Sequence, residues 1–179
     1  SRADGSEQWA VREDEGSYGE LSQIVDGRVY AGSTGTPETH AIDTSRGVTE
    51  KTVENSSTER IRATTDAVYL TTGYDLVKFP RDLSERSWQF VYDGVPYRAP
   101  LLDGDSVYTA GRSGGLHRID ADTGEVVWTY SGTFDGRDGD HAVGENYVWL
   151  ADGKTLHAVE RETGAGRVVG TLPDRKSVV

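Results

Sequence analysis

The chain has 179 residues, enough for one domain of ordinary size, and its formal net charge is -11 at pH 7. This acidic balance argues against nucleic-acid binding, which needs a basic face that displaces counterions. The chain contains no cysteine, which excludes both a disulfide framework and a thiolate metal site. Its 22 glycines and 5 prolines, together with little helical periodicity, favour an all-β fold.

Lysine is scarce, and arginine is the main basic residue; the lysines are Lys51, Lys78, Lys154 and Lys176. A carboxylate-rich surface with few lysines is typical of proteins from salt-loving archaea, because high salt screens its self-repulsion. The alternative is an acidic mesophilic surface that favours solubility or meets a basic partner. We expect the halophilic archaeal origin.

No stretch of the chain has the length and apolar character of a membrane span, and the first residues do not resemble a signal peptide. Because methionine is absent even at position 1, we expect a processed chain or a piece of a longer protein. The triplet Asn55-Ser56-Ser57 is a glycosylation sequon, which is compatible with export. We therefore expect an exported or cell-surface location over a cytoplasmic one.

A repeated unit runs from one end of the chain to the other. Each copy contains a valine followed by an aromatic residue, at Val29, Val68, Val107 and Val148. The copies are about 40 residues apart, and each contains short apolar runs separated by turn residues, as in a four-stranded meander. This period predicts a β-propeller, in which each sheet buries both faces against its neighbours. The alternative is a β-sandwich of irregular meanders.

In chain order, we expect four blades of four strands after one extra strand. The spacing of Asp4–Trp9 repeats that of Thr123–Trp128, so the chain opens with a lone fourth strand. The expected parts are residues 1–15 (outer strand of a preceding or closing blade), 16–55, 56–94, 95–134 and 135–179 (blades 1 to 4). Such a chain is either a small ring sealed by its two ends, part of a larger ring, or half of a homodimeric ring.

Each third strand runs into a polar turn that ends at Gly47, Ser84, Gly124 or Gly164. Four residues later, two copies have a tryptophan, Trp88 and Trp128, and the lone first strand ends at Trp9; the other two copies have Lys51 and Val168 instead. Aspartate and threonine side chains can cap such a turn, glycine permits a positive φ, and an indole fills a large gap between blades. The expected blade-docking residues are Trp9, Trp88, Trp128, Asp43, Gly47, Asp120, Thr123, Gly124, Thr163 and Gly164.

The run Asp120–Trp128 (DADTGEVVW) resembles the tryptophan-docking repeat of the PQQ-like quinoprotein β-propellers, Ala-x-Asp-x-x-Thr-Gly-x-x-x-Trp. The resemblance covers essentially the whole chain, although Lys78 and Arg118 replace the motif alanine and Glu160 replaces the aspartate. Members of this family include quinone-dependent alcohol dehydrogenases, non-catalytic scaffolds such as an outer-membrane assembly lipoprotein, and sensor domains. The resemblance therefore implies the fold and leaves the activity open.

Two functions of different classes remain. The first is a non-catalytic propeller module that binds a protein, peptide or other ligand through its loops, with no cofactor. The alternative is half of a dehydrogenase that depends on pyrroloquinoline quinone and calcium. That family's enzymes imply an eight-bladed ring and often a vicinal disulfide, which four blades and no cysteine do not provide. We expect the binding module.

For the other candidate sites, a structural interpretation of the residues is favoured over a functional one. His40, His117 and His157 occupy one place in three copies, which indicates a feature of the repeat and not a metal site. Ser113 lies in a G-x-S-x-G match, but between two predicted strands and not before a helix. Asp138 and Asp140 lie in an acidic loop that could hold calcium but lacks the spacing of a calcium-binding loop.

Overall fold

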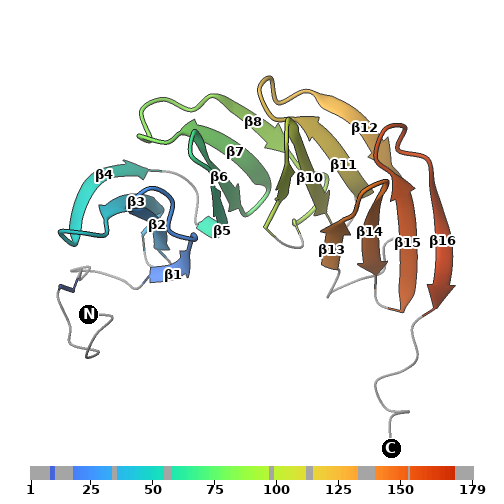
Figure 1. The fold of residues 1–179 in the computed structure, drawn as a ribbon, viewed down its shortest axis with the longest axis horizontal. Helices are drawn as coiled ribbons and strands as arrows, with labels where there is room; N and C mark the ends of the chain where they lie inside the picture. The colour runs from blue at the N-terminus through green and yellow to red at the C-terminus, as the bar shows by residue number, and fades with distance from the viewer. Residues whose placement is uncertain are drawn as a thin grey trace, which may run out of the picture. The chain divides into compact units, whose positions relative to one another are not determined.

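The computed structural model describes residues 9–10, 18–33, 36–54, 58–96, 99–111, 115–132, 140–152 and 154–171. All strands and turns of these residues belong to four antiparallel meanders, and each sheet contains four strands that are adjacent in sequence order (Figure 1). The four-stranded sheets that the repeats predict are therefore present. We call them blades 1 to 4 in chain order.

The first two blades are built by residues 18–91. Blade 1 contains β1 (Tyr18–Leu21), β2 (Arg28–Ser33), β3 (Glu38–Asp43) and β4 (Val48–Glu54). Blade 2 contains β5 (Thr58–Ala63), β6 (Ala67–Thr72), β7 (Asp75–Pro80) and β8 (Trp88–Val91). In blade 1, the aromatic Tyr30 of β2 lies opposite Ala41 of β3, which lies opposite Lys51 of β4.

The last two blades have the same order. Blade 3 contains β9 (Leu101–Asp103), β10 (Ser106–Gly111), β11 (Gly115–Asp120) and β12 (Val126–Tyr130). Blade 4 contains β13 (Asp140–Val143), β14 (Tyr147–Asp152), β15 (Thr155–Glu160) and β16 (Gly166–Thr171). In blade 3, Tyr108 lies opposite Arg118, which lies opposite Trp128. The position of Lys51 in blade 1 is therefore the position of Trp128 in blade 3.

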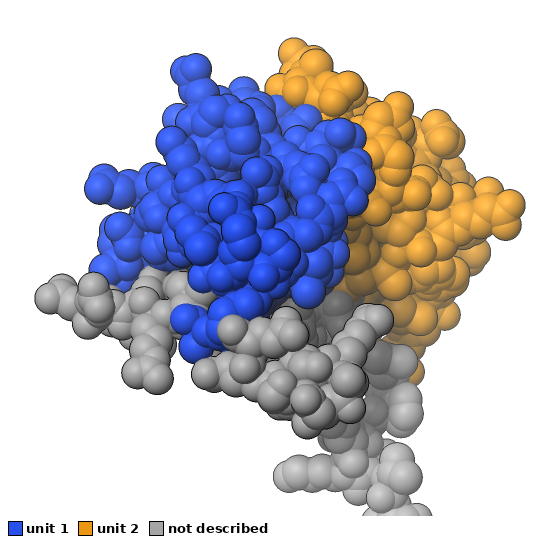
Figure 2. All heavy atoms as spheres, turned by 60° about the vertical axis from the view of Figure 1, so that its left-hand side comes forward, with its two compact units in different colours: residues 1–89 blue, residues 90–179 orange. Residues whose placement is uncertain are grey.

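The chain forms two compact units, residues 1–89 and residues 90–179 (Figure 2). Each unit has its own apolar cluster at the junction of its two blades. In the first unit, Tyr30 and Ala41 of blade 1 pack with residues of blade 2 that include Val77 and Phe79. In the second, Tyr108 and Trp128 belong to a cluster that also contains Val148, Leu150 and Val159 of blade 4. Burial on both faces explains why the middle strands are continuous apolar runs instead of alternating ones.

The turn after each third strand reverses the chain through a residue with positive φ. Gly47, Gly124 and Gly164 take this conformation in blades 1, 3 and 4. In blade 2 the sequence repeat aligns Ser84 with these glycines, but the residue that has positive φ is Leu83, with φ 53°. The amide of Leu83 donates to the carbonyl of Pro80, three residues back, whereas the amide of Gly164 donates to the carbonyl of Glu160, four residues back. The turn of blade 2 is thus one residue tighter.

Candidate functional site

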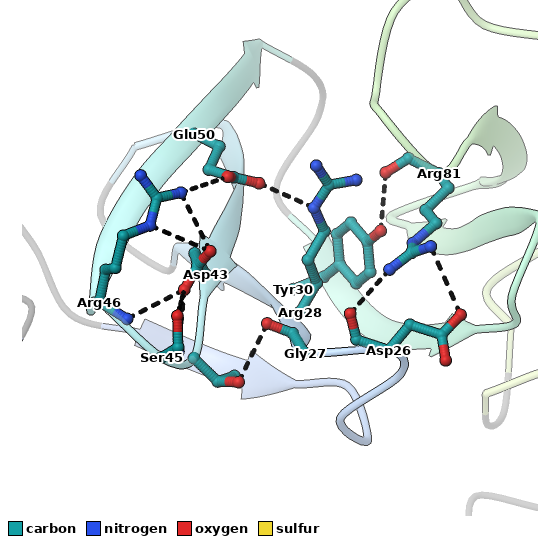
Figure 3. Close-up of polar contacts among 10 residues, drawn as sticks. Asp26, Gly27, Arg28, Tyr30, Asp43, Ser45, Arg46, Glu50 and Arg81 are labelled. Atoms are coloured by element: carbon teal, nitrogen blue, oxygen red, sulfur yellow. Dashed lines mark hydrogen bonds and ion pairs between the residues drawn. The ribbon is translucent and has the colours of Figure 1, made fainter.

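The most extensive polar network described lies at the junction of blades 1 and 2, within the first unit (Figure 3). It begins at the β1–β2 turn, where Asp26 and Gly27 both have positive φ, of 44° and 76°. Two such residues in succession make the tight turn that suits the twist of a hairpin. The turn is followed directly by Arg28, the first residue of β2.

The β3–β4 turn of blade 1 is capped by the carboxylate of Asp43. Its Oδ1 accepts hydrogen bonds from the Ser45 hydroxyl at 2.6 Å and from the backbone amides of Ser45 and Arg46. Its Oδ2 accepts from the Arg46 guanidinium. The Ser45 hydroxyl, and then the Arg46 side chain, hold the pKa of Asp43 well below its usual range, because these donors favour the ionised carboxylate.

Glu50 of β4 joins two arginines. It accepts from Arg28 Nε at 2.7 Å and from Arg46 Nη2 at 2.7 Å. The hydrogen bond from Arg28 to Glu50 raises the pKa of this arginine. Both ion pairs are partly exposed, so each contributes little stability by itself. Through Glu50 they connect Arg28, which follows the β1–β2 turn, with Arg46 of the β3–β4 turn.

Arg81 of blade 2 connects this network to the next blade. Its Nη2 donates to the carbonyl of Asp26 at 2.9 Å, and its Nη1 lies 3.4 Å from the Asp26 carboxylate. Its own carbonyl accepts a 2.6 Å hydrogen bond from the hydroxyl of the buried Tyr30. Burial raises the pKa of Tyr30, which keeps this hydroxyl protonated as a donor. We call Asp26, Arg28, Asp43, Arg46, Glu50 and Arg81 the charged junction; a cavity of about 390 Å³ opens among most of them.

The second unit has an equivalent arginine with different hydrogen-bond partners. Arg161, at the position of Arg81, contacts Asp103 and donates from Nε to the hydroxyl of Tyr108. Its carbonyl accepts from the indole Nε1 of Trp128 at 2.8 Å. In the first unit, Tyr30 donates to the equivalent carbonyl, because Lys51 stands where an indole would be. The equivalent carbonyls of the two units therefore accept from different donors, a phenol in the first and an indole in the second.

The junction of blades 1 and 2 is also packed differently. Leu83, the positive-φ residue of the tight turn, is fully buried in the cluster that contains Tyr30 and Ala41. At the corresponding place in the second unit, Trp128 lies over Gly164, where an added Cβ would come within 2.8 Å of the indole. A leucine from the turn therefore replaces part of the missing tryptophan. A cavity of about 280 Å³ remains, lined by Arg28, Ala41, Glu50, Lys51 and Asp82.

A third cavity, of about 490 Å³, lies along β7 in the same unit. Thr72, Asp75, Val77 and Phe79 of the β6–β7 hairpin line it, together with Glu54, Glu85 and Arg86. We call this the β7 cavity. Thr72, Val77 and Phe79 are buried, whereas Glu54, Glu85 and Arg86 are exposed. It therefore combines an apolar floor with a charged rim.

The expected blade-docking tryptophans make the following contacts. The Nε1 of Trp9 donates to the carbonyl of Thr44 at 2.9 Å, and an added Cβ on Gly47 would collide with the ring. Trp88 packs against Tyr69, with ring centroids 5.9 Å apart. The rest of the expected lone first strand lies outside the described residues. The docking role of these side chains stays a prediction.

The other expected docking residues lie within turns. Asp120 Oδ1 accepts from the amide of Thr123 at 2.8 Å, and the amide of Gly124 donates to the carbonyl of Asp120. In blade 4, the hydroxyl of Thr163 donates to Glu160 at 2.9 Å, so glutamate caps that turn in place of aspartate. These contacts explain why Asp, Thr and Gly recur at this spacing.

The three periodic histidines lie on third strands and are buried. The Nδ1 atoms of His40 and His117 are 2.9 Å and 3.0 Å from the hydroxyls of Thr52 and Thr129, and His157 Nδ1 is 3.1 Å from the hydroxyl of Tyr130. Each histidine is therefore tied to the neighbouring outer strand of its own unit. Burial lowers the pKa of His117.

Several weaker candidates lie outside the described residues, namely Ser113, Asp138 and the sequon Asn55-Ser56-Ser57. The ends of the G-x-S-x-G match pair with each other as the end of β10 and the start of β11, so the match joins two strands. Asp140 begins β13. Among the described residues, no group of three or more His, Asp or Glu side chains converges as a metal site.

The arginines and Glu50 of the charged junction were missed by the sequence reasoning. One signal could have found part of it: an arginine directly follows the third strand in blades 2 and 4, as Arg81 and Arg161. Lys51 was noted at the tryptophan position, but the sequence does not show the cavities that accompany it. No described helix is long and apolar enough to cross a membrane.

Comparisons with known proteins agree with this architecture. Residues 46–130 match a family model described as outer membrane protein assembly factor BamB. The structure of BamB from Moraxella catarrhalis is similar, with a TM-score of 0.72 and 23% identity over 88% of this chain. The chain spans about half of that protein's length, since 51% of it is covered. No curated protein matches the chain by sequence.

Two further structures show the same fold. The computationally designed protein Ika4 has a TM-score of 0.69 and 11% identity, over 93% of this chain and 99% of its own. The hydrazine synthase of Kuenenia stuttgartiensis has a TM-score of 0.69 and 13% identity, over 93% of this chain and 53% of its own. The predicted all-β propeller class is confirmed, and the matches support its PQQ-like repeat.

Proposed function

We propose that this chain is a non-catalytic PQQ-like propeller module that binds a protein or peptide partner. The observation that carries the proposal is the match of residues 46–130 to a family described as an outer membrane protein assembly factor. The matched residues run from the β3–β4 turn of blade 1 to the end of β12, and so include blade 2 with its β7 cavity.

The charged junction supports the same proposal. Arg28, Arg46 and Arg81 each pair with a carboxylate of blade 1, so their charges hold neighbouring turns in place. A scaffold whose turns are fixed in this way presents its loops in a defined arrangement, which is what a binding module requires. In this proposal the module binds its partner without catalysing a reaction and without a cofactor.

The test uses the full chain immobilised in concentrated salt, with extracts of its source cells as the mobile phase. A recovered protein is then purified, and its affinity for the chain is measured by calorimetry. A defined dissociation constant with one stoichiometry supports the proposal. Failure of every recovered protein to bind in the purified system contradicts it.

The same purified chain is titrated with pyrroloquinoline quinone and calcium. A shifted quinone absorbance, together with dye reduction in the presence of alcohols or sugars, would replace the binding module by the dehydrogenase alternative. We expect neither signal.

A further inference from the structure

We propose that the β7 cavity receives a lysine or arginine side chain of the partner polypeptide. This inference rests on the proposed function and names the chemistry of the contact. It is carried by the shape of the cavity, the state of the carboxylates around it and its apolar floor.

The carboxylates of the β7 cavity differ from those of the charged junction. Within the described part of the chain, the side chains of Glu54, Asp75 and Glu85 make no hydrogen bond or ion pair. Asp43 and Glu50, in the same unit, are each bound by an arginine. The carboxylates of the charged junction are therefore neutralised by arginines of the same chain, whereas those of the β7 cavity are not.

The charge of the lining favours a cation. Three carboxylates line the cavity together with one guanidinium, that of Arg86, so the lining is negative on balance. A metal ion is a poor occupant, because a hard cation needs several oxygens converging at about 2.3–2.6 Å. No such convergence of acidic side chains is present among the described residues. An extended organic cation can instead meet the carboxylates at separate points.

The floor of the cavity adds a requirement for an apolar stem. Val77 and Phe79 are 5% and 8% exposed and lie on the strand that runs along the cavity. Lysine and arginine bury their methylene stems against apolar surface while the charged head stays near water and carboxylates. The recessed floor also favours a side chain that projects from a partner's backbone.

The binding test uses a nonapeptide with one central arginine and glycine-serine flanks, titrated into the isotope-labelled full chain. Its neutral control contains citrulline, which has the same shape without the charge. We expect the arginine peptide to shift the amide resonances of Asp75, Val77 and Phe79, and the citrulline peptide to bind about tenfold more weakly. Equal dissociation constants for the two peptides would overturn the proposal.

Variants place the contact within the cavity. The triple variant E54Q/D75N/E85Q keeps the shape of the rim and removes its charge, so affinity for the arginine peptide should fall about tenfold. Arg86→Gln should raise the affinity, because it removes the only cation among the described residues of the lining. Glu50→Gln, in the paired charged junction, is the matched control and should leave it unchanged. An unchanged affinity in the triple variant, confirmed as folded by its spectrum, contradicts the proposal.

Spermidine separates the polypeptide from a small amine. If spermidine binds the cavity more tightly than the arginine peptide, the occupant is a free polyamine and the proposal is wrong. The outcomes also distinguish this inference from the proposed function. A partner that binds the triple variant as well as the wild type refutes the cavity contact alone, whereas failure of every purified candidate partner to bind the wild type contradicts the binding module.

Discussion

The hydroxyl of Tyr30 donates a 2.6 Å hydrogen bond to the carbonyl of Arg81, and thereby joins blade 1 to blade 2. The corresponding carbonyl in the second unit, that of Arg161, accepts from the indole of Trp128. One acceptor in the turn therefore has two alternative donors, a phenol from the second strand or an indole from the fourth. Several expected outcomes depend on this difference.

Tyr30→Phe should destabilise the chain by about 1–3 kcal/mol, because it leaves the carbonyl of Arg81 without its donor. The ring itself is retained, so the apolar packing of Tyr30 is unchanged. Urea denaturation followed by fluorescence measures the loss. Tyr74→Phe, at an exposed tyrosine, is the control and should change stability little. Equal effects of the two substitutions would contradict the role of this hydrogen bond.

Lys51 and Leu83 should behave as a coupled pair. Leu83→Gly removes a buried side chain at a cost of about 2–5 kcal/mol, only partly offset by easier adoption of positive φ. Lys51→Trp alone should also destabilise, because the indole meets Leu83. The double variant K51W/L83G should be more stable than the sum of the two changes by about 0.5–3 kcal/mol. Additive free energies of unfolding would show that the leucine does not occupy the indole's place.

Trp128→Ala should cost about 3–5 kcal/mol, because it empties a large buried site at the junction of blades 3 and 4. Gly164→Ala should be severely destabilising as well, since the added Cβ would collide with Trp128 and the residue has φ 72°. Val127→Ala, at an exposed neighbouring position, is the matched control. If Trp128→Ala and Gly164→Ala both unfold at nearly the urea concentration of the wild type, the predicted docking role of the tryptophan is refuted.

His117 should make stability depend on pH in the mildly acidic range. Burial lowers the pKa of His117 in the folded chain below the ordinary value of an imidazole, about 6.5, so the unfolded chain binds the proton more readily. The contribution is present above pH 6.5 and is lost as pH falls below it. Phe90 packs on the ring and Thr129 lies at its Nδ1.

His117→Val tests this dependence, because Val77 is the equivalent residue of blade 2. Thermal denaturation between pH 7 and about pH 5 should show a shallower fall in Tm for the variant than for the wild type. The comparison isolates His117 from the other histidines. A variant that loses Tm with the wild-type slope would exclude His117 as the cause.

The acidic surface should make the chain more stable in concentrated salt. Its formal net charge of -11 implies self-repulsion that salt screens. We expect Tm to rise between about 0.1 M and 3 M potassium chloride. If the chain is halophilic, most of this rise should occur above the salt concentration at which the screening of surface charges saturates. A Tm that levels off below about 0.5 M would favour the acidic mesophilic surface.

The sequence by itself determined the class of fold. A valine-aromatic pair recurring about every 40 residues, with glycine-rich turns between apolar runs, predicts four-stranded meanders because the information is local and repeated. The expected third blade, residues 95–134, contains the four strands β9 to β12. Burial on both faces leaves the same signature in each copy.

Only the tertiary structure decided what happens where the repeat departs from its pattern. The sequence shows Lys51 at a tryptophan position and Ser84 at a glycine position. It does not show that Leu83 takes the positive-φ place and fills part of the gap, or that Tyr30 takes over the carbonyl of Arg81. These outcomes depend on space shared by residues of two blades, which no local pattern encodes. The charged junction and the β7 cavity arise there for the same reason.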